Sequence, residues 1–152
     1  TLALLGMPQL LAEHLRAAPR IYSHLRTTGE RKEPVIEIIG RWRELADVCM
    51  QFLRREVAFS MVTIPEALSV LQLEDVIEEL ASYDLSISRL VVNNVVQAAD
   101  SPFLEQKRAQ QQPHLERLRM RYGSVPVVEI PLFPQEVRGV ERLRAVGNLL
   151  AR

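Results

Sequence analysis

The sequence predicts an α/β fold in which a parallel sheet follows a helical section. Three short apolar runs, near residues 57–63, 87–95 and 125–130, are typical of buried strands and alternate with stretches of helical periodicity. Strands separated by helices in this way pair in parallel through crossover connections. With 152 residues, of which 47% are hydrophobic and 25% charged, the chain can bury a core.

Residues 1–56 are expected to form the helical section. Pro8 stands at a favourable first-turn position, and apolar residues follow at helical spacing until Pro19 interrupts them. A longer helix is predicted from Pro34 to about Arg55, because its apolar side chains recur every three or four residues. This apolar stripe comprises Ile38, Trp42, Leu45, Cys49 and Phe52. Packing against a core and binding of another apolar helix explain the stripe equally well.

Residues 57–152 are expected to form the α/β part, beginning with the first strand and a helix. Thr63 and Glu66 have the spacing of a capping box, in which each side chain bonds the backbone amide of the other at the start of a helix. That helix is predicted to run to about Tyr83, with an apolar face and an acidic face.

Two further helices follow the second and third strands. Ser101 is expected to open the first of them, Pro113 to kink or divide it, and Gly123 to close it. Pro134 is expected to begin the last helix, whose apolar positions extend to Leu150.

Ligands of parallel sheets bind beyond the carboxyl ends of the strands. The three ends are predicted at residues 63–66, 93–94 and 131–133. Asn93 or Asn94 could read the edge of a planar base, because an amide offers both a donor and an acceptor. Asparagine is also a common turn residue at the end of a strand, and for Glu66 the sequence favours a role as a helix cap over one as a ligand.

Catalytic and metal-binding patterns are absent from the sequence. It has no glycine-rich phosphate loop, no Ser/His/Asp or Cys/His arrangement, and no histidines at metal-ligand spacing. Cys49 is the only cysteine and is expected to be a small buried residue on its helix. No catalytic residue and no metal ligand are therefore assigned.

Charge and hydropathy restrict the partners and the location. Nineteen basic and nineteen acidic side chains cancel, which gives no general attraction to nucleic acid. Residues 62–100 contain seven acidic side chains and one basic side chain, whereas residues 101–152 contain nine basic and five acidic side chains. No apolar run approaches the roughly 20 residues of a membrane span, and no leader peptide opens the chain, so a cytoplasmic location is expected.

Three blocks of the sequence together resemble one family. Residues 59–69, 90–94 and 130–139 are similar, in order and spacing, to segments of the arsenite-pump (ArsA-type, anion-transporting) ATPases. That family includes the cytosolic ATPases that carry tail-anchored membrane proteins. Residues 1–8 look like the segment that follows the family's switch-II motif, and Thr1 in place of Met suggests a partial chain.

The resemblance implies a partial P-loop-NTPase-like three-layer fold and the adenine side of an ATP site. Asn93 matches the family's base-reading asparagine, and Pro131 and Leu132 match the segment on the other side of the ring. Phe133 is a further candidate. Glu66 matches a family glutamate near the nucleotide and the dimer interface. ATP or ADP with Mg would be bound only together with an N-terminal part that carries the phosphate loop and the switches.

The resemblance also implies partners. A homodimer is expected, but residues 101–108 lack the Cys-x-x-C through which eukaryotic relatives join two subunits with zinc, so no zinc is expected. The helices near 7–25 and 36–53 occupy the place where relatives bind the apolar helix of a membrane-protein client, and a membrane transporter subunit is a further candidate partner. The sequence thus favours the C-terminal part of a cytoplasmic ATPase coupled to anion transport or membrane-protein delivery. The alternative is a non-catalytic module that binds a hydrophobic helix or a partner subunit.

Overall fold

The computed structural model describes the backbone of residues 35–151 and the side chains of residues 40–151. The chain divides into two compact units, and the boundary between them along the sequence lies between Val57 and Ala58. The helices expected before Pro34 and the segment 1–8 lie outside the described residues. None of the described helices is both long and apolar enough to cross a membrane.

The first unit contributes helix α3, Val35–Arg55, whose bounds confirm the predicted helix. The predicted apolar stripe is exposed at Trp42, Leu45 and Phe52, which keep 59%, 63% and 57% of their surface accessible. The prediction of a buried Cys49 is wrong: Cys49 is exposed, and the neighbouring Met50 is buried. Successive residues of a helix differ by about 100° in direction, so Cys49 and Met50 point to different faces.

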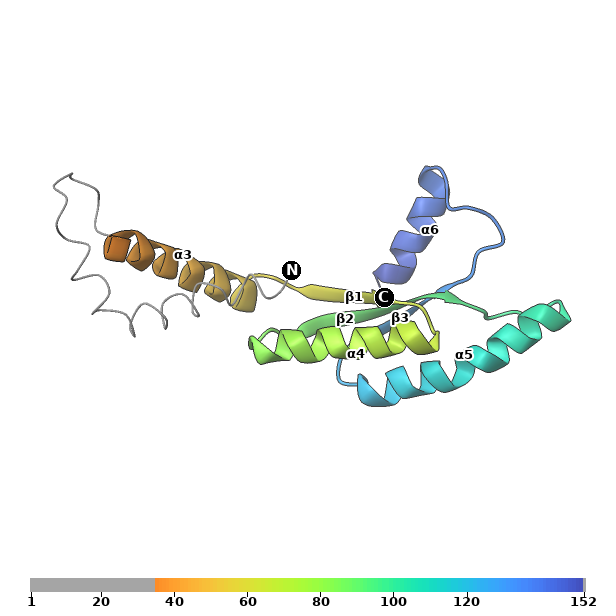
Figure 1. Ribbon diagram of the computed structural model, residues 1–152. Helices are drawn as coiled ribbons and strands as arrows, with labels where there is room; N and C mark the ends of the chain where they lie inside the picture. The colour runs from red at the N-terminus through yellow and green to blue at the C-terminus, as the bar shows by residue number, and fades with distance from the viewer. Residues whose placement is uncertain (1–34, 152) are drawn as a thin grey trace. The chain divides into compact units, whose positions relative to one another are not determined.

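The second unit contains a parallel sheet of three strands in the order β1-β2-β3 (Figure 1). Strand β1 is Phe59–Thr63, β2 is Ile87–Val95 and β3 is Val127–Pro131. These bounds lie at or within two residues of the predicted runs, and the α/β fold class is confirmed.

Helices cover both faces of this sheet (Figure 1). Helices α4 (Ala67–Ser82) and α5 (Pro102–Arg121) lie on one face, and α6 (Val140–Leu150) lies on the other. The main core lies between the sheet and α4 and α5; its fully buried members are Val70, Leu73, Leu90, Val92, Val95, Leu115, Leu118 and Tyr122. Helix α6 buries none of its residues completely.

Helix α4 does not begin with the predicted capping box. Its N-cap is Glu66, which makes no side-chain capping hydrogen bond. The chain turns tightly before the helix, since the backbone amide of Glu66 donates to the carbonyl of Ile64 at 2.8 Å. The Thr63 hydroxyl lies 3.3 Å from the carbonyl oxygens of Ile64 and Ser69, so it acts as a donor. This turn moves the helix start past Ile64 and leaves Thr63 too far back to cap it.

Helix α5 is continuous through Pro113, so of the two expected effects of this proline, a kink or a division, the division is wrong. Buried residues lie on both sides of the proline, Gln111 before it and Leu115 and Leu118 after it. Packing of both halves against the same sheet offsets the local cost of the missing amide. Ser101 caps the start as predicted, because its hydroxyl accepts from the Leu104 amide at 3.3 Å.

Helix α6 begins at Val140 rather than at Pro134. Gly139 has a φ of 82°, in the left-handed region that a right-handed helix cannot include. Residues 132–139 therefore form a loop between β3 and α6. At the end of the helix, Arg89 of β2 donates to the carbonyl of Leu150 and fixes the helix to the sheet.

Candidate functional site

A bulge shapes the carboxyl end of β2. Val92 pairs with Glu129 of β3, and Val95 pairs with Pro131, so β2 uses one residue more than its neighbour between these pairs. Asn94 takes a left-handed conformation with φ 60°, which asparagine tolerates better than most residues. The sequence left open whether Asn93 or Asn94 is a turn residue; the structure gives this role to Asn94.

The bulge is held from α5 by Gln111, which is only 2% exposed. Its amide nitrogen donates to the carbonyl of Asn94 at 3.0 Å, and its amide oxygen accepts from the Val96 amide at 2.9 Å. Sequence reasoning missed this residue. The available signal was a polar side chain in helical register with the buried Leu115 and Leu118.

A pocket of 470 Å³ opens beside this bulge, on the α6 face of the sheet. Asn93 contributes its amide, Ile130 and Val146 contribute apolar surface from β3 and α6, and Phe133 contributes a ring. Its volume lies within the roughly 300–1,000 Å³ of small-molecule sites. Among the described residues, no hydrogen bond holds the side-chain amide of Asn93. A flat heterocycle fits this combination of apolar walls and one free amide.

The structure brings together three of the five predicted site residues. Asn93, Leu132 and Phe133 line the same pocket. Pro131 ends β3 one residue before Leu132 and pairs with Val95, but it does not line the pocket.

Glu66 lies apart from the other four residues. It lines a separate pocket of 340 Å³ between α4 and α5, and its carboxylate accepts from the Lys107 ammonium at 2.8 Å. Both partners are partly exposed, at 50% for Glu66 and 35% for Lys107, so the pair stabilises little.

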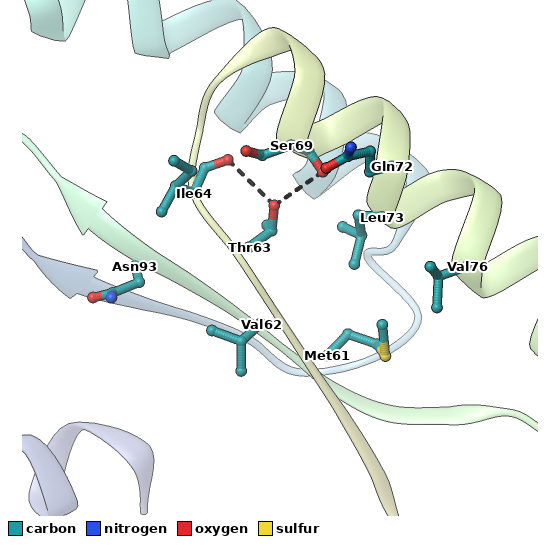
Figure 2. Close-up of a pocket in the computed structure, with 9 residues that line it drawn as sticks. All are labelled: Met61, Val62, Thr63, Ile64, Ser69, Gln72, Leu73, Val76 and Asn93. Carbon is teal, nitrogen blue, oxygen red and sulfur yellow. Dashed lines mark hydrogen bonds between the residues drawn. The ribbon is translucent and has the colours of Figure 1, made fainter. Parts of the chain in front are cut away.

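Asn93 also borders a second pocket, of 390 Å³, along β1 and α4 (Figure 2). Figure 2 shows the Thr63 hydroxyl directed toward the start of α4, whereas the Asn93 amide points away from it. The polar groups of this pocket thus do not converge on one point.

The described residues offer no cluster of three or more His, Cys, Asp or Glu side chains that could hold a metal ion.

An open parallel sheet with helices on both faces, and a pocket at the carboxyl ends of its strands, is consistent with a partial P-loop-NTPase-like α/β fold. Comparison with known sequences agrees with that class. The profile of the family described as anion-transporting ATPase matches residues 1–152, and the chain belongs to this family.

Individual relatives are moderately similar. ATPase GET3A of Arabidopsis thaliana is 32% identical over 73% of this chain and 34% of its own length. ATPase GET3 of Chaetomium globosum is 36% identical over 70% of this chain and 32% of its length. The ATPase ASNA1 homolog of Trypanosoma cruzi is 32% identical over 90% of this chain and 39% of its length. The chain thus spans about a third of the length of the curated relatives it matches.

Proposed function

We propose that this chain is the C-terminal part of a cytoplasmic ATPase and that its 470 Å³ pocket binds the adenine ring of ATP or ADP. The observation that carries the proposal is the position of Asn93, which borders the same pocket as the Phe133 ring and makes no side-chain hydrogen bond to any described residue. An amide can donate to and accept from the edge of adenine, while apolar side chains contact its faces. Membership of an ATPase family supports this choice of ligand.

The reacting phosphates would be bound by other parts of the protein. Mg-bound ATP would supply the phosphoryl group, and its hydrolysis would drive the proposed transport or delivery. The described residues include neither a phosphate loop nor a metal cluster. Within this proposal Asn93 reads the base, Leu132 and Phe133 contact the ring, and Pro131 fixes the end of β3 behind them. The family resemblance supports a homodimer and a coupling of hydrolysis to anion transport or membrane-protein delivery.

The proposal is tested by calorimetry on the intact gene product that contains this chain. We expect Asn93→Ala to weaken ADP binding by about tenfold, the effect of losing roughly one hydrogen bond to the base. Binding of inorganic tripolyphosphate with Mg should stay unchanged, because that ligand has no base.

Gln97→Ala is the matched control, since Gln97 is an exposed amide just beyond β2 that does not line the pocket. ADP binding by Asn93→Ala as tight as that of Gln97→Ala would show that the pocket does not hold the base. The chain of residues 1–152 alone is expected to show no Mg-dependent ATP hydrolysis, which a phosphate-release assay checks.

A second function, binding of an apolar helix, is favoured by α3. Trp42, Leu45 and Phe52 lie three to seven residues apart and are all more than half exposed. We propose that this row contacts a hydrophobic helix of a client or of a partner subunit. Crosslinking from a photoreactive residue at position 45 to an apolar helical peptide tests it, with position 44 as the control. Equal crosslinking from both positions would contradict the proposal.

A further inference from the structure

The loop that forms one wall of the 470 Å³ pocket has little regular structure of its own. Residues 132–139 connect β3 to α6, and Phe133, Gln135 and Val137 from this loop line the pocket. No residue of the loop is fully buried. The position of the wall therefore depends on a few specific contacts.

Arg142, in the first turn of α6, supplies two of those contacts. Its guanidinium donates to the carbonyl of Glu136 at 2.8 Å and to the side-chain oxygen of Gln135. The planar guanidinium directs both bonds at once, so it fixes two neighbouring loop residues relative to the helix. Gly139, with its left-handed backbone, lets the chain fold back so that the loop and the helix meet.

The loop has open space on both of its sides. A second pocket, of 240 Å³, lies behind it and is lined by Arg142 and Ala145 of α6 together with Phe133, Pro134 and Val137. These three loop residues and Gln135 line both this pocket and the 470 Å³ pocket. Without the two bonds from Arg142, the wall could move into the space behind it and widen the pocket.

We infer that Arg142 is a positioning residue of the base pocket. It holds residues 135 and 136 so that Phe133 and Leu132 keep the separation from Asn93 that a flat ring requires. Arg142 touches no ligand itself and acts only through the loop. This inference rests on the proposed binding of adenine and identifies a residue that sets its strength.

The test compares ligands with and without a base on the intact gene product. We expect Arg142→Ala to weaken ADP binding by about tenfold, because the ring loses an ordered wall, and to leave the binding of Mg-tripolyphosphate unchanged. Arg142→Lys should recover part of the affinity, since an ammonium can donate to the Glu136 carbonyl but lacks the fork. A general loss of structure would weaken both ligands alike.

Arg144→Ala is the matched control, because Arg144 is an exposed arginine on the same helix that lines neither pocket. Hydrogen exchange of the nucleotide-free protein supplies a readout independent of the ligand. Exchange should quicken at residues 135–139 in Arg142→Ala and stay unchanged in β2 and in Arg144→Ala.

Two outcomes would overturn the inference, and they are distinguishable. If Asn93→Ala weakens ADP binding but Arg142→Ala does not, the base pocket stands and Arg142 has no positioning role. If neither variant weakens ADP binding, the proposed function itself fails, and the role of Arg142 fails with it.

Discussion

Tyr122 lies at the end of α5 with its ring in the core and is 9% exposed. Among the described residues its buried hydroxyl has no hydrogen-bond partner. The Arg121 guanidinium lies over the ring, 5.9 Å from its centroid. Burial raises the pKa of Tyr122, because the ionised phenolate is less well solvated in the core than in water.

Replacement of Tyr122 by Phe is expected to be neutral or stabilising, by up to about 1 kcal/mol. A buried hydroxyl without a hydrogen-bond partner lowers the stability of the fold. Phenylalanine keeps the aromatic ring and removes the hydroxyl. Thermal unfolding of the two proteins measures the difference. A loss of more than 1 kcal/mol would indicate that the hydroxyl has a partner.

The same residue predicts a loss of stability at high pH. The pKa of Tyr122 is raised in the folded state, so the unfolded chain releases this proton first as the pH rises. The part of the unfolding free energy that depends on the protonated Tyr122 is therefore fully present below pH about 10, the ordinary pKa of tyrosine. It is lost as the pH rises further, through the raised pKa of the folded state. The unfolding free energy should fall less steeply above pH 10 in Tyr122→Phe than in the unmodified chain. Parallel curves for the two proteins would contradict this.

At the scale of elements, acidic side chains of α4 form ion pairs with arginines of α5. Glu74 of α4 is 6% exposed and accepts from the guanidinium of Arg117, while Glu78 accepts from Arg121 at 2.8 Å. The hydrogen bond and the charge of Glu74 raise the pKa of Arg117. The acidic middle of the sequence and its basic last third are thus two sides of one interface within the fold.

Gln111 is expected to be the most sensitive polar residue of α5. Gln111→Leu leaves the buried amide of Val96 and the carbonyl of Asn94 without this partner, which should cost about 2–3 kcal/mol. Gln112→Leu is the control, because Gln112 is exposed and its side chain bonds Glu116 one turn away on the same helix. Chemical denaturation of both variants checks the difference. Equal losses of stability in the two variants would show that the hydrogen bonds from Gln111 to the bulge do not stabilise the fold.

At the scale of the whole molecule, the sheet is open at β1. Among the described residues only β2 pairs with β1, and Val62 in this strand is 65% exposed. An unpaired strand edge with apolar neighbours favours pairing with another chain. The aligned relatives are more than twice as long as this chain.

The chain of residues 1–152 alone is expected to self-associate through this edge. Light scattering should give a mass above 17.3 kDa that rises with concentration. Val62→Lys should lower the associated fraction, because a charged side chain on an edge strand opposes pairing. Met120→Lys is the control, since Met120 is 81% exposed on α5, away from the strand. A stable monomer of the unmodified chain would contradict the expectation.

The sequence by itself determined the class of fold and most element positions. Apolar periodicity and capping residues are local signals, so they placed α3, β2 and the start of α5 correctly. They also placed Asn93, Leu132 and Phe133 at strand ends, where the parallel sheet brings them to one pocket.

Only the tertiary structure decided which faces and bonds these elements use. The buried face of α3 includes Met50 rather than Cys49, because burial depends on what packs against a helix. Glu66 pairs with Lys107, 41 residues away, instead of capping its own helix. Gln111 binds the bulge of β2, 15 to 17 residues earlier in the sequence. Arg142 binds the loop before α6, which ends at the left-handed Gly139. Periodicity describes one element at a time, whereas these contacts depend on where the folded chain places two elements together.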